Sequence, residues 1–170
     1  GVGVLGLGGL GHMAVKFAVS MGAEVTVLST SKNKEGDAKK LGAAHFVLTT
    51  DDSVMRSQRN SLDFIIDNVS ASHDFNQYLS LLKRDGTLIV VGIPSTPATI
   101  NNFALINGRK KIGGSSIGGI KETQEMLDYC ALHNIMCDVE MIPIQKINEA
   151  YERMIKGDVK YRFVIDMATL

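Results

Sequence analysis

Val2-Gly3-Val4-Leu5-Gly6-Leu7-Gly8-Gly9-Leu10-Gly11 is the stretch of sequence that decides the fold of this 170-residue chain. An apolar run of strand type leads into glycines with the spacing G-x-G-x-x-G. In this pattern Gly6 permits a tight turn, Gly8 lets the backbone approach phosphate oxygens, and Gly11 lets helix and strand pack closely. The N-terminus of the following helix offers free N–H groups and a positive dipole end. The stretch therefore predicts a cradle for the pyrophosphate of a dinucleotide.

Composition and charge narrow the classes of function. Lys and Arg number 18, as do Asp and Glu, so the chain lacks the excess positive charge that non-specific nucleic-acid or anionic-membrane binding requires. No apolar run approaches the roughly 20 residues that span a bilayer, and no signal peptide is visible. The two cysteines, Cys130 and Cys137, form no C-x-x-C motif, which is typical of a reducing cytoplasm and excludes a self-contained cysteine-rich zinc site. We expect a cytoplasmic protein with no nucleic-acid or membrane partner.

Strand-like and helix-like segments alternate over the first two thirds of the chain. The expected strands are 2–5, 24–28, 45–48, 62–67, 86–91 and 111–116. The first expected helix runs from the glycine turn to Gly22, and its apolar face consists of Met13, Ala14, Phe17, Ala18 and Met21. Three further helices are expected at 33–41, 73–83 and 121–134. The residues expected to point inward are Ala38 and Leu41 in the helix at 33–41, and Met126, Leu127, Cys130 and Ala131 in the helix at 121–134. This alternation predicts an α/β fold, a doubly wound parallel sheet of six strands of the Rossmann type.

The pattern changes beyond about Cys137. A strand at Val139–Pro143, a helix at 144–156 and a strand at Tyr161–Asp166 form a short β-α-β tail. Because this tail is too small to fold alone, we expect it to dock on another part of the protein. The chain thus divides into a dinucleotide-binding domain, 1–137, and a C-terminal segment, 138–170. Because Gly1 stands within one residue of the first strand, we expect the chain to be the later part of a longer protein.

The end of the second strand bears on the choice of cofactor. In NAD-binding versions of this fold an acidic residue closes that strand and accepts hydrogen bonds from the adenosine ribose. Here the strand ends in Leu28-Ser-Thr-Ser-Lys-Asn-Lys34, with no carboxylate. Hydroxyls and ammonium groups suit a 2′-phosphate, so the sequence favours NADP(H). The alternative interpretation is a Ser/Thr N-cap followed by solvated lysines.

Several ordered motifs together resemble one family, the zinc-dependent medium-chain alcohol dehydrogenases, and within it the NADP-dependent cinnamyl alcohol dehydrogenase branch. The motifs are Gly6-Leu-Gly-Gly-Leu-Gly-His12, Ser29-Thr-Ser31 with Lys34, Lys40-Leu-Gly-Ala43, Asp63-Phe-Ile-Ile-Asp67, Leu82-Lys-Arg-Asp-Gly-Thr87, Val91-Gly92, Gly114-Ser-Ser-Ile-Gly-Gly119 and Tyr161-Arg-Phe-Val-Ile-Asp166. The resemblance covers essentially the whole chain. It implies that the tail from about residue 138 completes the family's catalytic domain.

The resemblance also implies a role for individual positions in binding NADP(H). The pyrophosphate would be held by Gly6, Gly8, Gly9, Leu10 and Gly11, with Arg162 facing it. The 2′-phosphate site would be Ser29, Thr30, Ser31 and Lys34, where Thr30 departs from members that carry Arg. The chain would pass the cofactor at Asn68, Val69 and Ser70, and would line the nicotinamide with Val91, Gly92, Ile93, Ser115, Ser116 and Ile117.

In this family the zinc ligands and the proton relay lie N-terminal to the glycine turn. The resemblance therefore implies no catalytic and no metal-binding residue in this chain, with zinc only in the missing N-terminal domain. We expect the cofactor-binding portion of an NADP-dependent alcohol dehydrogenase, an oxidoreductase that interconverts alcohols and aldehydes by hydride transfer, and a portion that is inactive alone. The alternatives are a zinc-free quinone or enoyl reductase and a non-catalytic nucleotide-sensing module. A homodimer paired through segment 101–120 is a further expectation.

The remaining titratable side chains have simpler interpretations. We expect His12 to serve helix-start packing or to lie near phosphate. His45, His73 and His133 lack the spacing of metal ligands and are interpreted as surface or capping residues. Asp63 and Asp67 flank a strand, where strand-end solvation or hydrogen bonding is favoured over a pair of functional carboxylates.

Overall fold

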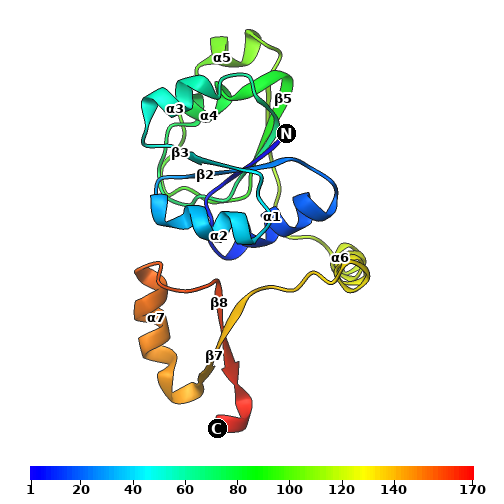
Figure 1. Ribbon diagram of the computed structural model, residues 1–170, viewed down its shortest axis with the longest axis vertical. Coiled ribbons are helices and arrows are strands. Elements are labelled where there is room, and N and C mark those ends of the chain that lie inside the picture. The colour runs from blue at the N-terminus through cyan, green and yellow to red at the C-terminus, as the bar shows by residue number, and fades with distance from the viewer.

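The strand that opens the chain, β1 (Val2–Leu5), lies inside a six-stranded sheet of order β3-β2-β1-β4-β5-β6, in which every pairing is parallel. The computed structural model describes all residues, 1–170 (Figure 1). The other strands are β2 (Val25–Ser29), β3 (His45–Leu48), β4 (Leu62–Asp67), β5 (Leu82–Val90) and β6 (Lys111–Gly114). The chain returns from β3 to pair β4 with β1, so the strand order reverses beside β1. The predicted doubly wound sheet is confirmed.

Helices cover both faces of this sheet (Figure 1). They are α1 (Gly9–Ser20), α2 (Glu35–Lys40), α3 (Asp52–Ser57), α4 (Phe75–Leu79) and α5 (Asn102–Ile106), with a 3₁₀ turn, η1 (Lys32–Lys34), before α2. Successive side chains of a strand point to opposite faces. Accordingly Val4 packs with Val15 and Ala38 under α1 and α2, whereas Leu5 packs with Leu79 on the other face. The sheet thus has two apolar cores, one on each face.

The buried face of α1 differs from the predicted one. His12, Val15 and Ala18 are buried, whereas Met21, which was expected to point inward, is 67% exposed. Met21 lies just beyond the last helical residue, so the helical spacing no longer applies to it. Gly22 ends the helix as predicted, with a φ of +80° that favours glycine.

Two helices of the region after β4 also differ from expectation. The helix predicted at 73–83 is only α4, because Leu82 already pairs with Leu62 as the first residue of β5. Helix α5 is not among the expected helices. Its N-cap is Asn101, whose side-chain Oδ1 accepts a hydrogen bond from the N–H of Phe103 at 3.0 Å. A short helix capped by a polar side chain has too little apolar periodicity to be recognised.

The predicted inward face of the long helix α6 (Ile120–His133) is wrong. This helix has no buried residue, and Met126 and Leu127 are 40% and 51% exposed. It lies beside the sheet rather than on it (Figure 1). Its contact with α1 runs through Tyr129, whose hydroxyl lies 3.0 Å from that of Ser20. Helix α6 therefore has the predicted apolar stripe, but this stripe does not pack against the sheet.

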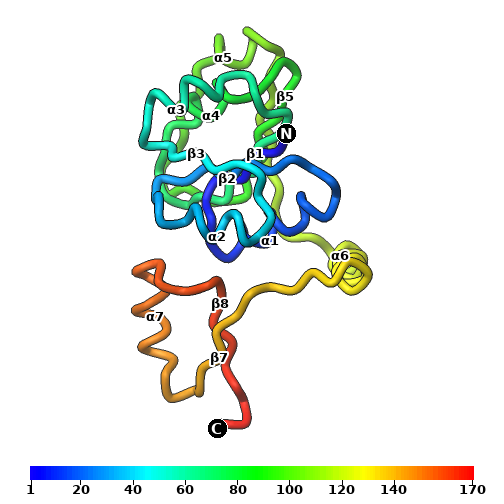
Figure 2. The backbone as a smooth tube through the Cα atoms, in the orientation of Figure 1, coloured from blue at the N-terminus to red at the C-terminus, as the bar shows by residue number.

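The C-terminal segment forms the expected β-α-β unit. Strands β7 (Val139–Pro143) and β8 (Arg162–Asp166) pair in parallel, and α7 (Ile147–Ile155) connects them. Short 3₁₀ turns, η2 (Ile144–Lys146) and η3 (Met167–Thr169), precede α7 and follow β8. Figure 2 shows this unit below the main sheet, reached by an extended stretch after α6. None of the helices combines the length and the apolarity needed to cross a bilayer.

Candidate cofactor cleft

The glycine turn joins the end of β1 to the start of α1, at the place where the strand order reverses. Gly6 has a φ of +85°, which a side chain rarely tolerates, and its N–H donates to the carbonyl of Leu28 at 3.0 Å. A Cβ on Gly11 would lie 2.0 Å from the carbonyl oxygen of Gly6, so helix and turn pack through a bare backbone. A Cβ on Gly8 would meet nothing within 4 Å. The turn thus leaves an open space beside Gly8, where a ligand can approach the backbone.

A first cleft, which we call the glycine-turn cleft, lies between this turn and the C-terminal segment. Its charged lining residues are Lys34 and Arg162, and Arg162 Nη2 lies 3.4 Å from the carbonyl oxygen of Gly9. The lining consists of Gly6, Leu7, Gly8, Gly9, Leu10, Gly11, Lys34, Asn68, Met154, Gly157, Val159, Tyr161 and Arg162. Residues from both ends of the chain therefore form one cleft.

A second cleft, the hydroxyl cleft, shares the turn and Lys34 with the first and extends toward the end of β2. There the Ser31 N–H donates to Ser29 Oγ at 3.1 Å, which holds the loop after β2 in a tight turn. The lining consists of Leu5, Gly6, Leu7, Gly8, Leu28, Ser29, Thr30, Ser31, Lys34, Val69, Ala71, Ser72, His73 and Tyr78. Neither cleft has an Asp or Glu among its lining residues.

The structure brings together most of the residues expected to bind the cofactor. Those that line one or both clefts are Gly6, Gly8, Gly9, Leu10, Gly11, Ser29, Thr30, Ser31, Lys34, Asn68, Val69 and Arg162. Those that line neither are Ser70, Val91, Gly92, Ile93, Ser115, Ser116 and Ile117. Of the second group, Ile93 and Ile117 are 84% and 95% exposed. The role of this group beside the nicotinamide stays a prediction.

His12 is fully buried behind the glycine turn, as the interpretation of helix-start packing implies. Its Nδ1 lies 3.2 Å from the carbonyl oxygen of Gly8, and its Nε2 accepts from the N–H of Asp138 at 3.3 Å. The ring stacks on that of Tyr161. Burial, with a smaller effect of Lys16, lowers the pKa of His12, so the neutral ring is favoured. His12 therefore ties the glycine turn to the C-terminal segment.

Tyr161 is a cleft residue to which the sequence analysis assigned no role in cofactor binding. It is 7% exposed, and Lys34 Nζ lies 5.9 Å from the centre of its ring. Burial, together with the nearby carboxylates Asp37 and Asp138, raises the pKa of its hydroxyl to about 12. Only the docking of the C-terminal segment on α1 brings Tyr161 to the cleft.

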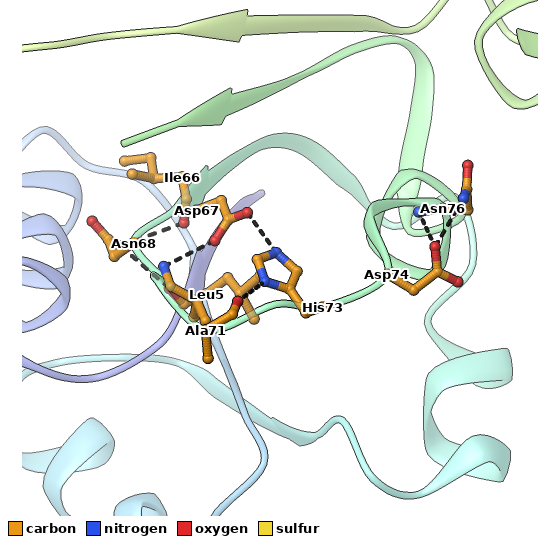
Figure 3. Close-up of polar contacts among 9 residues, drawn as sticks. Leu5, Ile66, Asp67, Asn68, Ala71, His73, Asp74 and Asn76 are labelled. Atoms are coloured by element: carbon orange, nitrogen blue, oxygen red, sulfur yellow. Dashed lines mark hydrogen bonds and ion pairs between the residues drawn. The ribbon is translucent and has the colours of Figure 1, made fainter. Parts of the chain in front are cut away.

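The interpretation of His73 as a surface or capping residue is wrong. Its side chain is 13% exposed and lines the hydroxyl cleft, and its Nε2 lies 2.8 Å from Oδ2 of the fully buried Asp67 (Figure 3). Asp67 is hydrogen-bonded, as was favoured from the sequence. Asp63 instead is 57% exposed and pairs with Lys83, so one aspartate of β4 lies at the surface and the other is buried.

The side chains offer no cluster of three or more His, Cys, Asp or Glu residues that could hold a metal ion. The residues of this chain therefore do not form a ligand set that fits zinc.

An open parallel sheet with a glycine turn at the reversal of strand order, bordered by two clefts, has the architecture of a Rossmann-type nucleotide-binding domain. The family model described as zinc-binding dehydrogenase matches residues 9–131. The chain belongs to the zinc-binding dehydrogenase family, as the sequence motifs predicted.

Relatives and solved structures of this family resemble the chain over nearly its whole length. It is 54% identical to a probable mannitol dehydrogenase of Medicago sativa and 55% identical to an 8-hydroxygeraniol dehydrogenase of Catharanthus roseus, covering 98% of this chain and 47% of each relative. A cinnamyl alcohol dehydrogenase of Sorghum bicolor superposes with a TM-score of 0.95 at 46% identity, covering 98% of this chain and 48% of the other. The Helicobacter pylori enzyme in complex with NADP(H) gives 0.87 at 42%, with the same coverage. The chain thus spans about half the length of these relatives.

Proposed function

We propose that this chain is the cofactor-binding part of an NADP(H)-dependent zinc alcohol dehydrogenase, an enzyme that interconverts alcohols and aldehydes. The observation that carries the proposal is the charge of the two clefts: Lys34 is common to both, Arg162 lies at the glycine turn, and no carboxylate lines either. Membership of the zinc-binding dehydrogenase family supports the reaction class. The Helicobacter pylori relative in complex with NADP(H) supports the cofactor.

The glycine-turn cleft fits the pyrophosphate of the cofactor. The backbone beside Gly8 is open, α1 begins at Gly9 with unpaired N–H groups in its first turn, and Arg162 adds a cation. When bound, NADP(H) supplies the hydride, whereas the residues of this chain bind and orient the cofactor. The stretches Asn68–Ser70, Val91–Ile93 and Ser115–Ile117 would guide the rest of the cofactor toward the nicotinamide.

The hydroxyl cleft is the proposed site of the 2′-phosphate. Ser29, Thr30 and Ser31 offer hydroxyl groups, and Lys34 offers a charged donor. A hydrogen bond to a charged group contributes about 1.5–3 kcal/mol, whereas a carboxylate in this position would repel the phosphate. Thr30 cannot provide the two parallel donors of an arginine, so we expect weaker NADPH binding than in family members with Arg there.

The remaining parts of the enzyme are proposed from the family resemblance. Zinc and the residues that act on the alcohol oxygen would belong to an N-terminal domain, so this chain alone would be inactive. Segment 138–170 would complete that catalytic domain, and 1–137 would be the cofactor-binding domain. The edge strand β6 and the exposed Phe103 and Ile106 beside it support the expected homodimer through segment 101–120. The substrate would be a small alcohol or aldehyde, and the enzyme would be cytoplasmic.

Calorimetric titration of the 170-residue chain with NADPH and with NADH tests the proposal. NADPH should bind at least tenfold more tightly, and its advantage should shrink as salt screens the 2′-phosphate. Equal or tighter binding of NADH contradicts the assigned phosphate site. Binding of neither dinucleotide contradicts the cofactor-binding role itself.

A further inference from the structure

Asp67 and His73 form a closed hydrogen-bonded loop behind the hydroxyl cleft (Figure 3). Asp67 ends β4, is fully buried, and accepts at Oδ1 from the N–H of Val69 at 3.0 Å. Its Oδ2 lies 2.8 Å from His73 Nε2. The other ring nitrogen, Nδ1, lies 2.8 Å from the carbonyl oxygen of Ala71. Val69, Ala71 and His73 all line the hydroxyl cleft, so the carboxylate of Asp67 sits directly behind the cleft wall.

The contacts limit how protons can be distributed in this pair. A carbonyl oxygen only accepts hydrogen bonds, so Nδ1 of His73 must donate to Ala71. When Asp67 is ionised, its carboxylate only accepts, so Nε2 donates to Asp67 and the ring carries protons on both nitrogens. The N–H of Val69 donates to the other carboxylate oxygen of Asp67, Oδ1, at 3.0 Å. In that state His73 is the counter-cation of a buried carboxylate, and the pair is neutral as a whole.

Neutralisation of Asp67 would affect ligand binding because this carboxylate lies close to the lining of the hydroxyl cleft. Val69 is held tightly between two glycines: a Cβ on Gly6 would lie 2.8 Å from Val69 Cγ2, and one on Gly92 would lie 2.5 Å from the carbonyl oxygen of Val69. The backbone beside Asp67 is thus tightly packed, and solvent does not reach the carboxylate to screen it because its exposure is 0%. An unneutralised charge there would act across the cleft at low effective dielectric. It would oppose a phosphate far more than a neutral ribose hydroxyl.

We propose that His73 is a specificity-determining residue of the cofactor cleft, because it neutralises Asp67 behind the site of the adenosine 2′-phosphate. This inference rests on the proposed function, since it concerns the same site. His73 acts through Asp67 and the shape of the wall, because both of its N–H groups are already used within the protein. The sequence pattern Asp67-Asn-Val-Ser-Ala-Ser-His73 thereby takes part in the choice between two cofactors.

The test compares the ratio of the NADH and NADPH dissociation constants in four variants of the chain. His73→Gln keeps a donor near Asp67 but removes the cation, and it should lower the preference for NADPH about tenfold. The double variant Asp67→Asn with His73→Gln removes both charges and should restore the preference to within about threefold of the original chain. His73→Lys, which retains a cation beside Asp67, should also retain the preference and remains informative if His73→Gln unfolds.

The matched control is His45→Gln. His45 pairs with Glu24 at 2.9 Å, but this pair is exposed on β3 and lines neither cleft, so its loss should leave both constants unchanged. If His73 has only a structural role, His73→Gln should weaken the binding of NADH and of NADPH by the same factor, and the double variant should restore neither. That result would overturn the inference. If the unmodified chain itself fails to prefer NADPH, the proposed function fails first, which is a different result.

Discussion

The imidazole of His12 stacks on the ring of Tyr161, with ring centroids 4.6 Å apart and an angle of 14° between the planes. Both side chains are buried, one at the start of α1 and the other just before β8. The backbone supports the stack, because the N–H of Tyr161 donates to the carbonyl of Asp138, whose own N–H donates to His12. The stack therefore joins the glycine turn to the segment that carries Arg162.

Replacing Tyr161 should loosen this junction. Tyr161→Ala removes a buried aromatic ring and its stacking partner, so the free energy of unfolding should fall by about 3 kcal/mol. NADPH should also bind more weakly, because Arg162 loses its neighbour at the cleft. Tyr161→Phe keeps the ring and should remain within about 1 kcal/mol. Urea unfolding and calorimetry measure both effects; equal stability of the two variants would mean that the stack contributes nothing.

His12 should make stability depend on pH. Its pKa is lowered in the folded chain, mainly by burial, so as pH falls through about 6.5 the unfolded chain takes up the proton first. The contribution of His12 is therefore fully present above that pH and declines below it. His12→Phe cannot titrate, so the difference in unfolding free energy between the original chain and this variant should shrink from pH 7.5 to pH 5. A difference that stays constant over this range would contradict the lowered pKa.

Gly11 should tolerate no side chain. A Cβ there meets the Gly6 carbonyl at 2.0 Å, and backbone cannot move aside cheaply, so Gly11→Ala should cost at least about 2 kcal/mol of unfolding free energy. Gly36 of α2 is the matched control, because its Cβ would meet nothing within 4 Å. Gly36→Ala should raise stability by about 0.5–1 kcal/mol. Thermal or urea unfolding separates the two; similar effects would refute the packing argument.

Gly8 should instead separate binding from folding. Its φ of −124° suits any residue and its Cβ would enter open space, so Gly8→Ala should change unfolding free energy by less than about 1 kcal/mol. The added methyl group would occupy the space in which a phosphate approaches the backbone, and NADPH affinity should fall at least tenfold. Undiminished affinity in this variant would place the pyrophosphate elsewhere.

Lys34 should contribute to the choice of cofactor. Lys34→Ala removes the cation common to both clefts, and NADPH affinity should fall about tenfold, with NADH affected less. Lys39→Ala is the control, because Lys39 is an exposed lysine paired with Glu35 at 2.7 Å on the next helix. Comparable losses of NADPH affinity in both variants would indicate only a general effect of positive charge.

The sheet could be predicted from the sequence because its signals are local. Each buried strand is a short apolar run, and Gly22 and Gly42 mark helix ends with positive φ. Helix faces were harder, because periodicity reports an apolar stripe but not its partner. Met126 and Leu127 form such a stripe on α6 and are nonetheless exposed. The predicted helix end at residue 83 is wrong, because leucine is compatible with both a helix and a strand and Leu82 belongs to β5.

The lining of the clefts was predictable where spacing along the chain decides it, as at the glycine turn and at Ser29–Ser31. It was not predictable where the fold joins distant residues. Tyr161 reaches the cleft only because the C-terminal segment docks on α1, and His73 turns inward only because Asp67 is buried at the end of β4. Tyr161 opens a motif of the resembled family, but that motif does not show which cleft its ring reaches, and His73 lies outside the motifs quoted for that family.

The glycine-turn cleft joins residues as far apart in sequence as Gly9 and Arg162, which are 153 positions apart. A ligand held there works as a removable cross-link between the two ends of the chain. At a concentration one hundred times its dissociation constant, it adds about 2.7 kcal/mol to the stability of the joined state. Backbone amides of β8 should then exchange with deuterium more slowly as ligand is added, so the order of the C-terminal segment would report how much of the cleft is occupied.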